Sequence, residues 1–323
     1  IRSILELLKA DRDFELLCLI DSPENLSILV KALHGYPIGR PLKLLLEVGA
    51  PLGRTGIRED NAALKLAKAV KEAEPLVELS GVEAYEGIFD VNTADGRNNA
   101  DRLLERATNI TSMCAKLDLL ASGPIVITAG GTTYFDRVVE HFDSLDIKRP
   151  LKKIIRSGCY LTHDIGYCRR AYERIASRLP SVKSPAFSPM PALEVISVIQ
   201  STPEHGRAIA ALGKRDISFD VDLPIPLWRS KRTDPRSTRS LDGSIKVSAL
   251  NDQHAYLDVS RKADIEVGDV VGDRGRQRAG RAGDGGPRYG LGAAAEVAEK
   301  ARGVALTAAD VQNPVVWFYD FFY

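Results

Sequence analysis

The chain is poor in the residues that mark several large classes of protein. Among its 323 residues there are four cysteines, two methionines and two tryptophans, and the formal net charge is +1. The cysteines lie far apart, without the close spacing of a zinc finger, which indicates reduced thiols instead of a disulfide framework. They are Cys18, Cys114, Cys159 and Cys168. A balanced charge gives no general attraction to nucleic acid, membrane surfaces or polyanions.

Long apolar runs are also absent. No stretch approaches the roughly 20 consecutive apolar residues of a membrane-spanning helix, and the chain does not open with a secretory signal peptide. A content of 44% hydrophobic and 27% charged residues is typical of a globular protein of about two domains. We therefore expect a cytoplasmic protein that binds neither membranes nor nucleic acid.

Apolar segments alternate with amphipathic ones through the first half of the chain. Strands are predicted at residues 14–20, 42–48, 79–87, 124–131 and 152–161, and helices at residues 1–10, 22–34, 58–74, 98–121, 134–145 and 164–179. This alternation indicates βαβ units and a parallel sheet. Glycine-bearing loops follow nearly every strand and no GxGxxG follows the first one, which favours a (β/α) barrel over an open dinucleotide-binding sheet.

The second half of the chain has a different composition. From about residue 185 it contains short alternating strands and several prolines, which predict an antiparallel β domain, and residues 230–244 are expected to form a polar loop. From Asp273 onward Gly, Arg and Ala dominate, a composition that buries little apolar surface. This tail is interpreted either as flexible or as the product of a shifted reading frame. The predicted parts are residues 1–184, 185–272 and 273–323.

The most informative segment is residues 42–57, LKLLLEVGAPLGRTGI. Its apolar strand ends in two loop glycines, and Arg54 follows them directly. In a barrel of parallel strands, chemistry gathers in the loops at the carboxyl ends of the strands. Arg54 can meet an anionic oxygen of a ligand there, although a solvated arginine at the start of a helix is at least as consistent with the pattern.

Two later loops have the character of phosphate-binding sites. Residues 127–136 end a strand with Gly130, Gly131 and Thr132 at the start of a helix, where free backbone N–H groups favour an anion. Residues 156–164 end the next strand with Gly158. Glycines after strands are also ordinary turn devices, but loops on adjacent barrel strands face the same point. A shared phosphate site and two simple turns both remain open on the pattern alone.

Six motifs in a fixed order connect the chain to one family. They are GRTGI (53–57), GVEAYEG (81–87), TAGGTTYFD (128–136), RSGCYLTHDIG (156–166), ALGKRDISFD (211–220) and NDQHAYL (251–257). Over residues 1–271 the chain resembles the D-serine dehydratase and D-threonine aldolase-like family, in its amino acid deaminase subgroup. The resemblance implies an α/β fold: an incomplete (β/α) alanine-racemase-type barrel that binds pyridoxal phosphate, followed by a mainly antiparallel β domain.

The resemblance also implies roles for individual residues. Arg54 would contact the phenolic oxygen of pyridoxal phosphate, and Tyr160 would lie beside its pyridine ring. Tyr85 would lie on the substrate side, and His254 would approach from the β domain as a polar group of the site. The phosphate would be held by Gly130, Gly131, Thr132, Gly158 and Cys159. The alternatives are half-buried barrel tyrosines and an interface histidine without a chemical role. Lys214 and Asp216 are expected to form a structural ion pair.

Two features of the family pattern are missing. Its Schiff-base lysine lies in a segment like P-H-x-K-T, which would precede Ile1, and Lys9 and Lys43 are not placed to substitute. Its divalent metal, usually zinc, is bound by an H-x-C or H-x-D pair shortly after a strand like GDVVG (268–272). The segment that follows here contains no His and no Cys, the side chains a zinc site needs, so no metal ligand is assigned.

The resemblance therefore predicts a lyase for β-hydroxy D-amino acids, of which this chain is an inactive piece. The reaction would be D-serine dehydration and deamination or D-threonine-type aldol cleavage, on a small-molecule substrate and in a homodimer. One alternative is a pyridoxal phosphate-binding barrel with a racemase-like or carrier role. Another is a non-catalytic scaffold.

The first prediction is that the chain as given releases no pyruvate, ammonia or glycine from D-serine or D-threonine, with pyridoxal phosphate and zinc added. The reason is the missing lysine, since loss of a positioned general base costs about 10²–10⁴ in rate. The measurement is product release over days at high protein concentration. Turnover that stops on borohydride treatment, with the reduced adduct on a lysine of this chain, would contradict the prediction.

Overall fold

The computed structural model describes residues 1–131, 133–156, 163, 166–179, 194–219 and 222–274. The chain forms two compact units that divide between residues 158 and 159. The sequence predicts a boundary at residue 184 instead. Because residues 180–193 lie outside the described part, that boundary and the proposed tail from residue 275 onward stay predictions. Of the tail, only the backbone of residues 273 and 274 is described, and it continues a strand.

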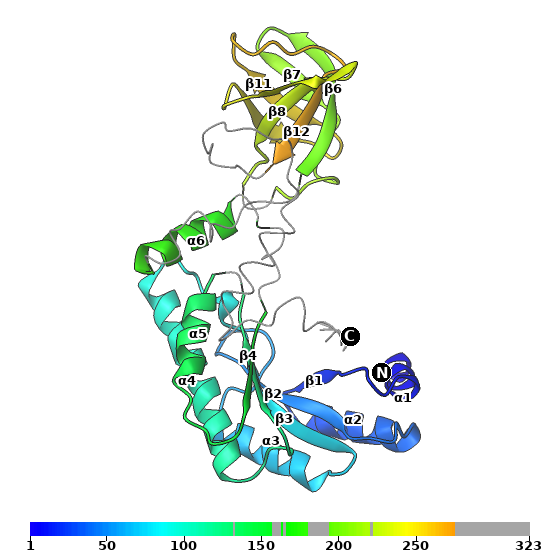
Figure 1. Ribbon diagram of the computed structural model, residues 1–323, viewed down its shortest axis with the longest axis vertical. Helices are drawn as coiled ribbons and strands as arrows, with labels where there is room; N and C mark the ends of the chain where they lie inside the picture. The colour runs from blue at the N-terminus through cyan, green and yellow to red at the C-terminus, as the bar shows by residue number, and fades with distance from the viewer. Residues whose placement is uncertain (132, 157–162, 164–165, 180–193, 220–221, 275–323) are drawn as a thin grey trace. The chain divides into compact units, whose positions relative to one another are not determined.

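The first unit is built on a parallel sheet with the strand order β1-β2-β3-β4-β5. The strands are β1 (Leu17–Ile20), β2 (Leu42–Val48), β3 (Val77–Ala84), β4 (Ile125–Ala129) and β5 (Leu151–Ile155). Between them run α2 (Pro23–Gly35), α3 (Asp60–Glu72), α4 (Ala94–Lys116) and α5 (Phe135–Asp143), after an initial α1 (Arg2–Ala10). Figure 1 shows this alternation of strand and helix. The predicted βαβ organisation is confirmed.

The core of the first unit lies between the sheet and these helices. Leu44, Leu46 and Ile127 of the strands pack with Leu66 of α3 and Leu104 of α4, all almost fully buried. A smaller cluster of Leu45, Val126 and Ile154 fills the opposite face of the sheet. Burial on both faces explains why these strands are continuous apolar runs instead of alternating ones.

The second unit consists of α6 (Tyr167–Arg178) and a seven-stranded sheet of order β10-β11-β7-β6-β12-β8-β9. Its strands are β6 (Glu194–Glu204), β7 (Arg207–Ala210), β8 (Pro226–Lys231), β9 (Asp234–Ser240), β10 (Ile245–Leu250), β11 (Ala255–Val259) and β12 (Val270–Arg274). All of its pairings are antiparallel. The predicted α/β part followed by a mainly antiparallel β part is confirmed.

The predicted polar loop at residues 230–244 is wrong. Most of it forms a hairpin of β8 and β9, in which Trp228 pairs with Ser240 and Lys231 with Asp234. Backbone hydrogen bonds to a neighbouring strand decide this structure. An edge strand tolerates a polar, arginine-rich sequence, and charged side chains protect such an edge from pairing with other molecules.

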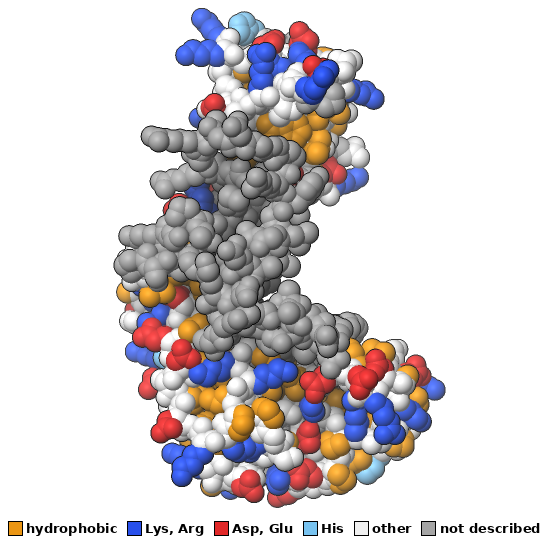
Figure 2. Space-filling view, viewed as in Figure 1, with side chains coloured by type: hydrophobic (Ala, Val, Ile, Leu, Met, Phe, Trp, Pro, Cys, Tyr) orange, Lys and Arg blue, Asp and Glu red, His pale blue; other side chains and the backbone are white. Residues whose placement is uncertain are grey.

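No helix in the described part of the chain is both long and apolar enough to cross a membrane. On the face shown in Figure 2, acidic and basic side chains are interspersed over the coloured parts of the molecule. This distribution agrees with the near-neutral net charge of +1.

One arginine fixes the end of α1 to the sheet. The Arg40 guanidinium donates hydrogen bonds to four backbone carbonyls, those of Leu8 (3.1 Å), Asp11 (3.1 Å), Arg12 (2.7 Å) and Phe14 (2.7 Å). The last carbonyls of a helix have no partner within the helix. The guanidinium of Arg40 therefore caps the end of α1 and fixes the segment between α1 and β1.

Replacing this arginine should destabilise the first unit. We expect Arg40→Lys to lower the free energy of unfolding by about 1–3 kcal/mol, because one ammonium cannot reach four carbonyls and hydrogen bonds from charged groups are among the stronger ones. Urea denaturation followed by circular dichroism measures the change. Arg12→Lys is the matched control, since only the backbone of Arg12 takes part. Equal midpoints for the two variants would show that the contact contributes nothing.

Candidate functional site

A row of polar side chains crosses the sheet of the first unit near the carboxyl ends of its strands. Glu47 of β2 is the register partner of Glu83 of β3, and Glu83 is the partner of Thr128 of β4. Register partners on neighbouring parallel strands project from the same face of the sheet. Each of the three is the next-to-last residue of its strand. The row therefore lies where a parallel barrel concentrates its chemistry.

Arg156, directly after β5, binds to this row. Its guanidinium donates to the Glu83 carboxylate, to the carbonyl of Ala84 at 2.7 Å and to the Thr128 hydroxyl at 3.1 Å. The side chains of Arg156 and Glu83 are 7% and 2% exposed. A single buried cation thus joins the ends of β3, β4 and β5, with a charge-assisted hydrogen bond at its centre.

Burial also changes the acidity of the carboxylates. Removal from water raises the pKa of Glu83 to about 7; the neighbouring Arg156 opposes the rise and Glu47 adds to it. The Oε2 atom of Glu83 is buried and has no hydrogen-bond partner among the described residues. Burial likewise raises the pKa of Glu47, against the hydrogen bond that its carboxylate accepts from Thr55. Burial thus opposes the ionisation of both of these adjacent carboxyl groups.

A second arginine, Arg58, binds the backbone of the loop that carries Arg54. Gly49 and Ile57 close its base, with N–H groups that donate to the carbonyls of Ile57 (3.0 Å) and Glu47 (2.8 Å). The Arg58 guanidinium donates to four carbonyls of the loop, those of Gly53, Arg54, Thr55 and Gly56. These bonds fix the backbone of the loop and leave the Arg54 side chain exposed to solvent.

Arg54 and Tyr85, two residues predicted for the site, lie together. The guanidinium carbon of Arg54 is 5.0 Å from the centroid of the Tyr85 ring, within the range of a cation–π contact. No acidic side chain among the described residues forms an ion pair with Arg54. Its charge is therefore available to an anionic oxygen of a ligand.

The amides of Gly130 and Gly131 are engaged in a way the sequence did not predict. Both donate hydrogen bonds of 2.9 Å to the carboxylate of Glu86, in η1 (Glu86–Ile88), which begins after Tyr85 at the end of β3. Glu86 is 0% exposed, and burial raises its pKa while these hydrogen bonds oppose the rise. In this structure neither amide is free for a phosphate, so phosphate binding at these glycines stays a prediction that requires Glu86 to move away.

The remaining predicted cofactor residues, Thr132, Gly158, Cys159 and Tyr160, lie outside the described residues. Their roles stay predictions. The sequence missed Glu47, Glu83, Glu86, Arg58 and Arg156 as site residues. Three of them nevertheless lie within the motifs that carried the family resemblance. GVEAYEG contains Glu83 and Glu86, and RSGCYLTHDIG begins with Arg156.

In the second unit, two of the resemblance motifs meet. A shallow pocket of about 330 Å³ is lined by Lys214, Asn251, Asp252, Gln253 and His254. The N–H groups of Lys214 and Arg215 donate to the carbonyls of Asn251 (2.8 Å) and Asp252 (3.1 Å). Gly213 permits this contact, because a Cβ there would lie 2.3 Å from the carbonyl oxygen of Asp252.

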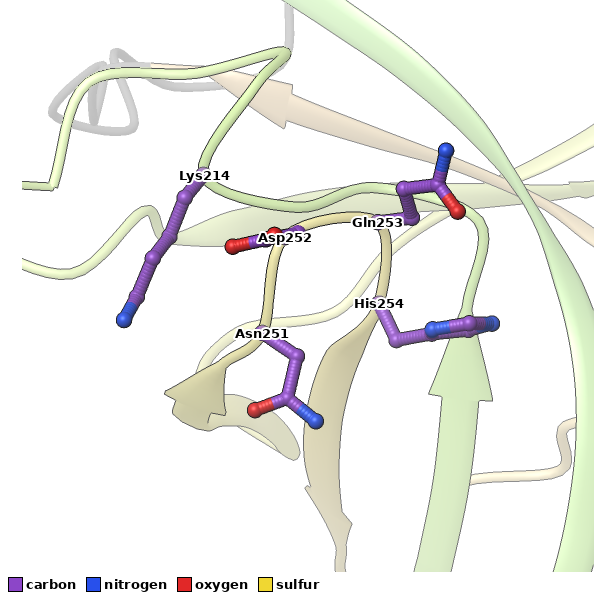
Figure 3. A pocket seen from close by; sticks show the side chains of 5 residues that line it. All are labelled: Lys214, Asn251, Asp252, Gln253 and His254. Atoms are coloured by element: carbon purple, nitrogen blue, oxygen red, sulfur yellow. The ribbon is translucent and has the colours of Figure 1, made fainter.

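The side chains around this pocket do not converge. Figure 3 shows Lys214 and His254 pointing to opposite sides of the turn at residues 251–254. His254 is exposed and belongs to the second unit. Its role as a polar group of the cofactor site stays a prediction.

The predicted ion pair between Lys214 and Asp216 is wrong. The Asp216 carboxylate accepts a hydrogen bond from the N–H of Gly213 at 2.8 Å, and the Lys214 ammonium lies 5.3 Å from the centroid of the Phe219 ring. A short acidic side chain in a turn often caps its own backbone. This local bond takes precedence over a contact with a long, flexible lysine.

No group of three or more His, Cys, Asp or Glu side chains in the described ranges is arranged to hold a metal ion. The assignment of zinc consequently rests on the family resemblance alone.

Comparison with known proteins supports the resemblance at the level of domain and fold. Residues 192–272 match a family model described as a putative serine dehydratase domain. A crystal structure of D-threonine aldolase from Filomicrobium marinum superposes with a TM-score of 0.60 at 19% identity, over 85% of this chain and 65% of that one. D-threo-3-hydroxyaspartate dehydratase from Delftia sp. HT23 gives a TM-score of 0.53 at 16% identity, over 84% of this chain and 68% of that one.

The chain thus spans about two thirds of the length of these enzymes. At identities this low, the superpositions establish a common fold alone. A search among curated protein sequences gives no match.

The buried carboxyl group predicts a specific pH dependence of stability. The folded protein holds the Glu83 proton more tightly than the unfolded chain, whose ordinary pKa is 4.5, so folding takes up a proton between pH 4.5 and about 7. The contribution of Glu83 to the free energy of unfolding therefore falls as pH rises through this window, by on the order of 3 kcal/mol. Glu83→Gln should remove this dependence.

The measurement is urea denaturation at several pH values from 4.5 to 8. The control is Glu72→Gln, because Glu72 is an exposed glutamate at the end of α3. It should keep the wild-type pH dependence. A constant difference in stability between wild type and Glu83→Gln across the window would show that Glu83 does not titrate there.

Proposed function

We propose that this chain comes from a pyridoxal phosphate-dependent lyase that acts on D-amino acids with a β-hydroxyl group. The observation that carries the proposal is the contact between Arg54 and Tyr85, at the carboxyl edge of a parallel sheet whose fold D-threonine aldolase shares. The domain match of residues 192–272 supports the same class of reaction. The reaction is D-serine-type dehydration and deamination or D-threonine-type aldol cleavage.

The residues at this edge fit part of the cofactor. Arg54 presents a cation without an acidic partner in the described part of the chain, as the phenolic oxygen of pyridoxal phosphate needs. Tyr85 offers an aromatic face beside that cation. The amides of Gly130 and Gly131 fit less well, because the Glu86 carboxylate accepts both N–H groups. The proposal therefore assigns the phosphate chiefly to Thr132, Gly158 and Cys159, and the face of the pyridine ring to Tyr160.

Pyridoxal phosphate supplies an electron sink once its aldehyde has condensed with an amine. In this chain Arg54 would keep the phenolic oxygen ionised, and Tyr85 would limit the position of the substrate. The Arg156 cation stays fixed by Glu83, so that the end of β5 keeps its position while ligands exchange. His254 is proposed as a polar group of the same site.

Neither Lys43 nor Lys9 is placed to supply the Schiff base. Lys43 lies at the amino end of β2 and pairs with Glu15 at 2.6 Å, and the Lys9 ammonium on α1 lies 5.0 Å from the centroid of the Tyr36 ring. In the family a divalent metal, zinc, assists departure of the β-hydroxyl group, and the proposal assigns no metal ligand to this chain. A cytoplasmic homodimer that binds only small molecules completes the proposal.

Two other functions use the same observations. A pyridoxal phosphate-binding barrel with a racemase-like or carrier role would bind the cofactor without cleaving β-hydroxy amino acids. A scaffold would bind neither the cofactor nor amino acids. Cofactor binding separates the scaffold from the other two, and product release by a longer chain that includes an upstream lysine segment separates the lyase from the carrier.

The test of cofactor binding is calorimetry of the full chain with pyridoxal phosphate and with phosphate-free pyridoxal. We expect Arg54→Ala to weaken both by about tenfold, since a hydrogen bond between charged groups contributes about 1.5–3 kcal/mol and 1.4 kcal/mol is tenfold in affinity. Arg54→Lys should recover part of the loss. Arg12→Ala, an exposed arginine next to α1, is the control.

Two results would contradict the proposal. If Arg54→Ala bound pyridoxal phosphate as tightly as the wild type does, Arg54 would have no role in the site. If the wild type bound pyridoxal and pyridoxal phosphate equally, the loops would form no phosphate site.

A further inference from the structure

The two glycines at residues 130 and 131 have a structural task besides any contact with an anion. Gly131 lies against the Tyr85 ring: a Cβ on Gly131 would stand 3.2 Å from the Cε2 atom of the tyrosine. Gly87 borders the same ring, because a Cβ there would lie 2.6 Å from both Cζ and the hydroxyl oxygen. A side chain at either position would therefore press on the ring. Tyr85 therefore packs against the backbone of two glycines and also contacts the Arg54 guanidinium.

Glu86 connects these parts. It follows Tyr85 directly in the chain, and its fully buried carboxylate binds the N–H groups of Gly130 and Gly131 at 2.9 Å each. Of these two glycines, the second is the one that touches the ring. The bridge joins segments 44 residues apart in sequence. The carboxylate thus fixes the distance between the backbone at Tyr85 and the loop against which the ring packs.

From this geometry we propose that Glu86 is a positioning residue, which holds Gly131 against Tyr85 and so gives the ring a single orientation facing Arg54. This inference rests on the proposed function for the meaning of Tyr85 as a residue of the ligand site. The orientation itself can be measured without any ligand. The glycine pair after β4 then serves to admit an aromatic ring and to present two N–H groups to an internal carboxylate.

The two acceptor oxygens of Glu86 are essential to this role, because each binds one of the glycine N–H groups. Glutamine has nearly the same shape, but its amide group offers one acceptor oxygen and one NH₂ donor. In Glu86→Gln the NH₂ group would face one of the two glycine N–H groups, so that one backbone donor would lose its acceptor. A buried donor without a partner destabilises its surroundings. We expect the loop to shift and the Tyr85 ring to gain a second orientation.

The experiment places 3-fluorotyrosine at position 85 of the full chain and records its fluorine NMR spectrum without ligand. The wild type should give one narrow signal, because the fluorine occupies one side of a fixed ring. Glu86→Gln should give two signals or one broadened severalfold. Glu72→Gln, an exposed glutamate on α3, should leave the spectrum unchanged.

Gly131→Ala provides a second variant that does not disturb the carboxylate. Its Cβ would press on the ring and should displace the same fluorine signal. Gly35→Ala is the matched control, since a Cβ on Gly35 meets nothing within 4 Å. If Glu86→Gln fails to fold, Gly131→Ala decides the question. A wild-type spectrum in a folded Glu86→Gln or in Gly131→Ala would overturn the inference.

Calorimetry with pyridoxal phosphate then separates this inference from the proposed function. If Tyr85 belongs to the ligand site, Glu86→Gln should weaken binding about tenfold, together with the spectral change. One outcome is that Glu86→Gln changes the spectrum while the wild-type protein does not bind pyridoxal phosphate. This outcome would support the positioning role and contradict the proposed function. The other outcome is that Glu86→Gln leaves the spectrum unchanged while the wild-type protein binds pyridoxal phosphate. This outcome would contradict the positioning role and support the proposed function.

Discussion

The bond between Arg156 and Glu83 joins the strand ends on which the candidate site is built. It brings the end of β5 to β3, and the same guanidinium reaches β4 through the Thr128 hydroxyl. Breaking one member of a buried pair leaves an uncompensated charge, which costs far more than the pair contributes when intact. Glu83, Thr128 and Arg156 are therefore constrained as a group. Any ligand at this edge of the sheet therefore meets side chains whose positions are set before it binds.

A second set of contacts lies next to this pair. Glu86 binds the loop after β4, and Tyr85 is confined between that loop and Arg54. Buried carboxyl groups thus accept hydrogen bonds from a guanidinium in one place and from backbone amides in the other. In both places the donors bind acceptors within the protein, whereas Arg54, on the loop bound by Arg58, is exposed to solvent.

The fold and part of the site could be read from the sequence because they depend on local patterns. Apolar runs such as residues 42–48 predicted β2 with the bounds that the structure shows. The family resemblance assigned Arg54 and Tyr85 to one site, but it did not predict that they contact each other. The errors fell where a local signal was misleading. Polar composition concealed the β8–β9 hairpin, and neighbouring opposite charges suggested an ion pair that Asp216 forgoes for a backbone N–H.

The sequence by itself determined the alternation of strands and helices and the antiparallel second part, since the period of apolar residues decides which face of an element is buried. It also determined that Arg54 follows a buried strand, residues 42–48, in a loop that contains glycines. Only the tertiary structure decided that Glu83 meets Arg156, 73 residues away, and that Glu86 meets Gly130, 44 residues away. Such contacts depend on the register between parallel strands. That register is fixed by packing of the whole sheet against its helices, and no stretch of sequence contains it alone.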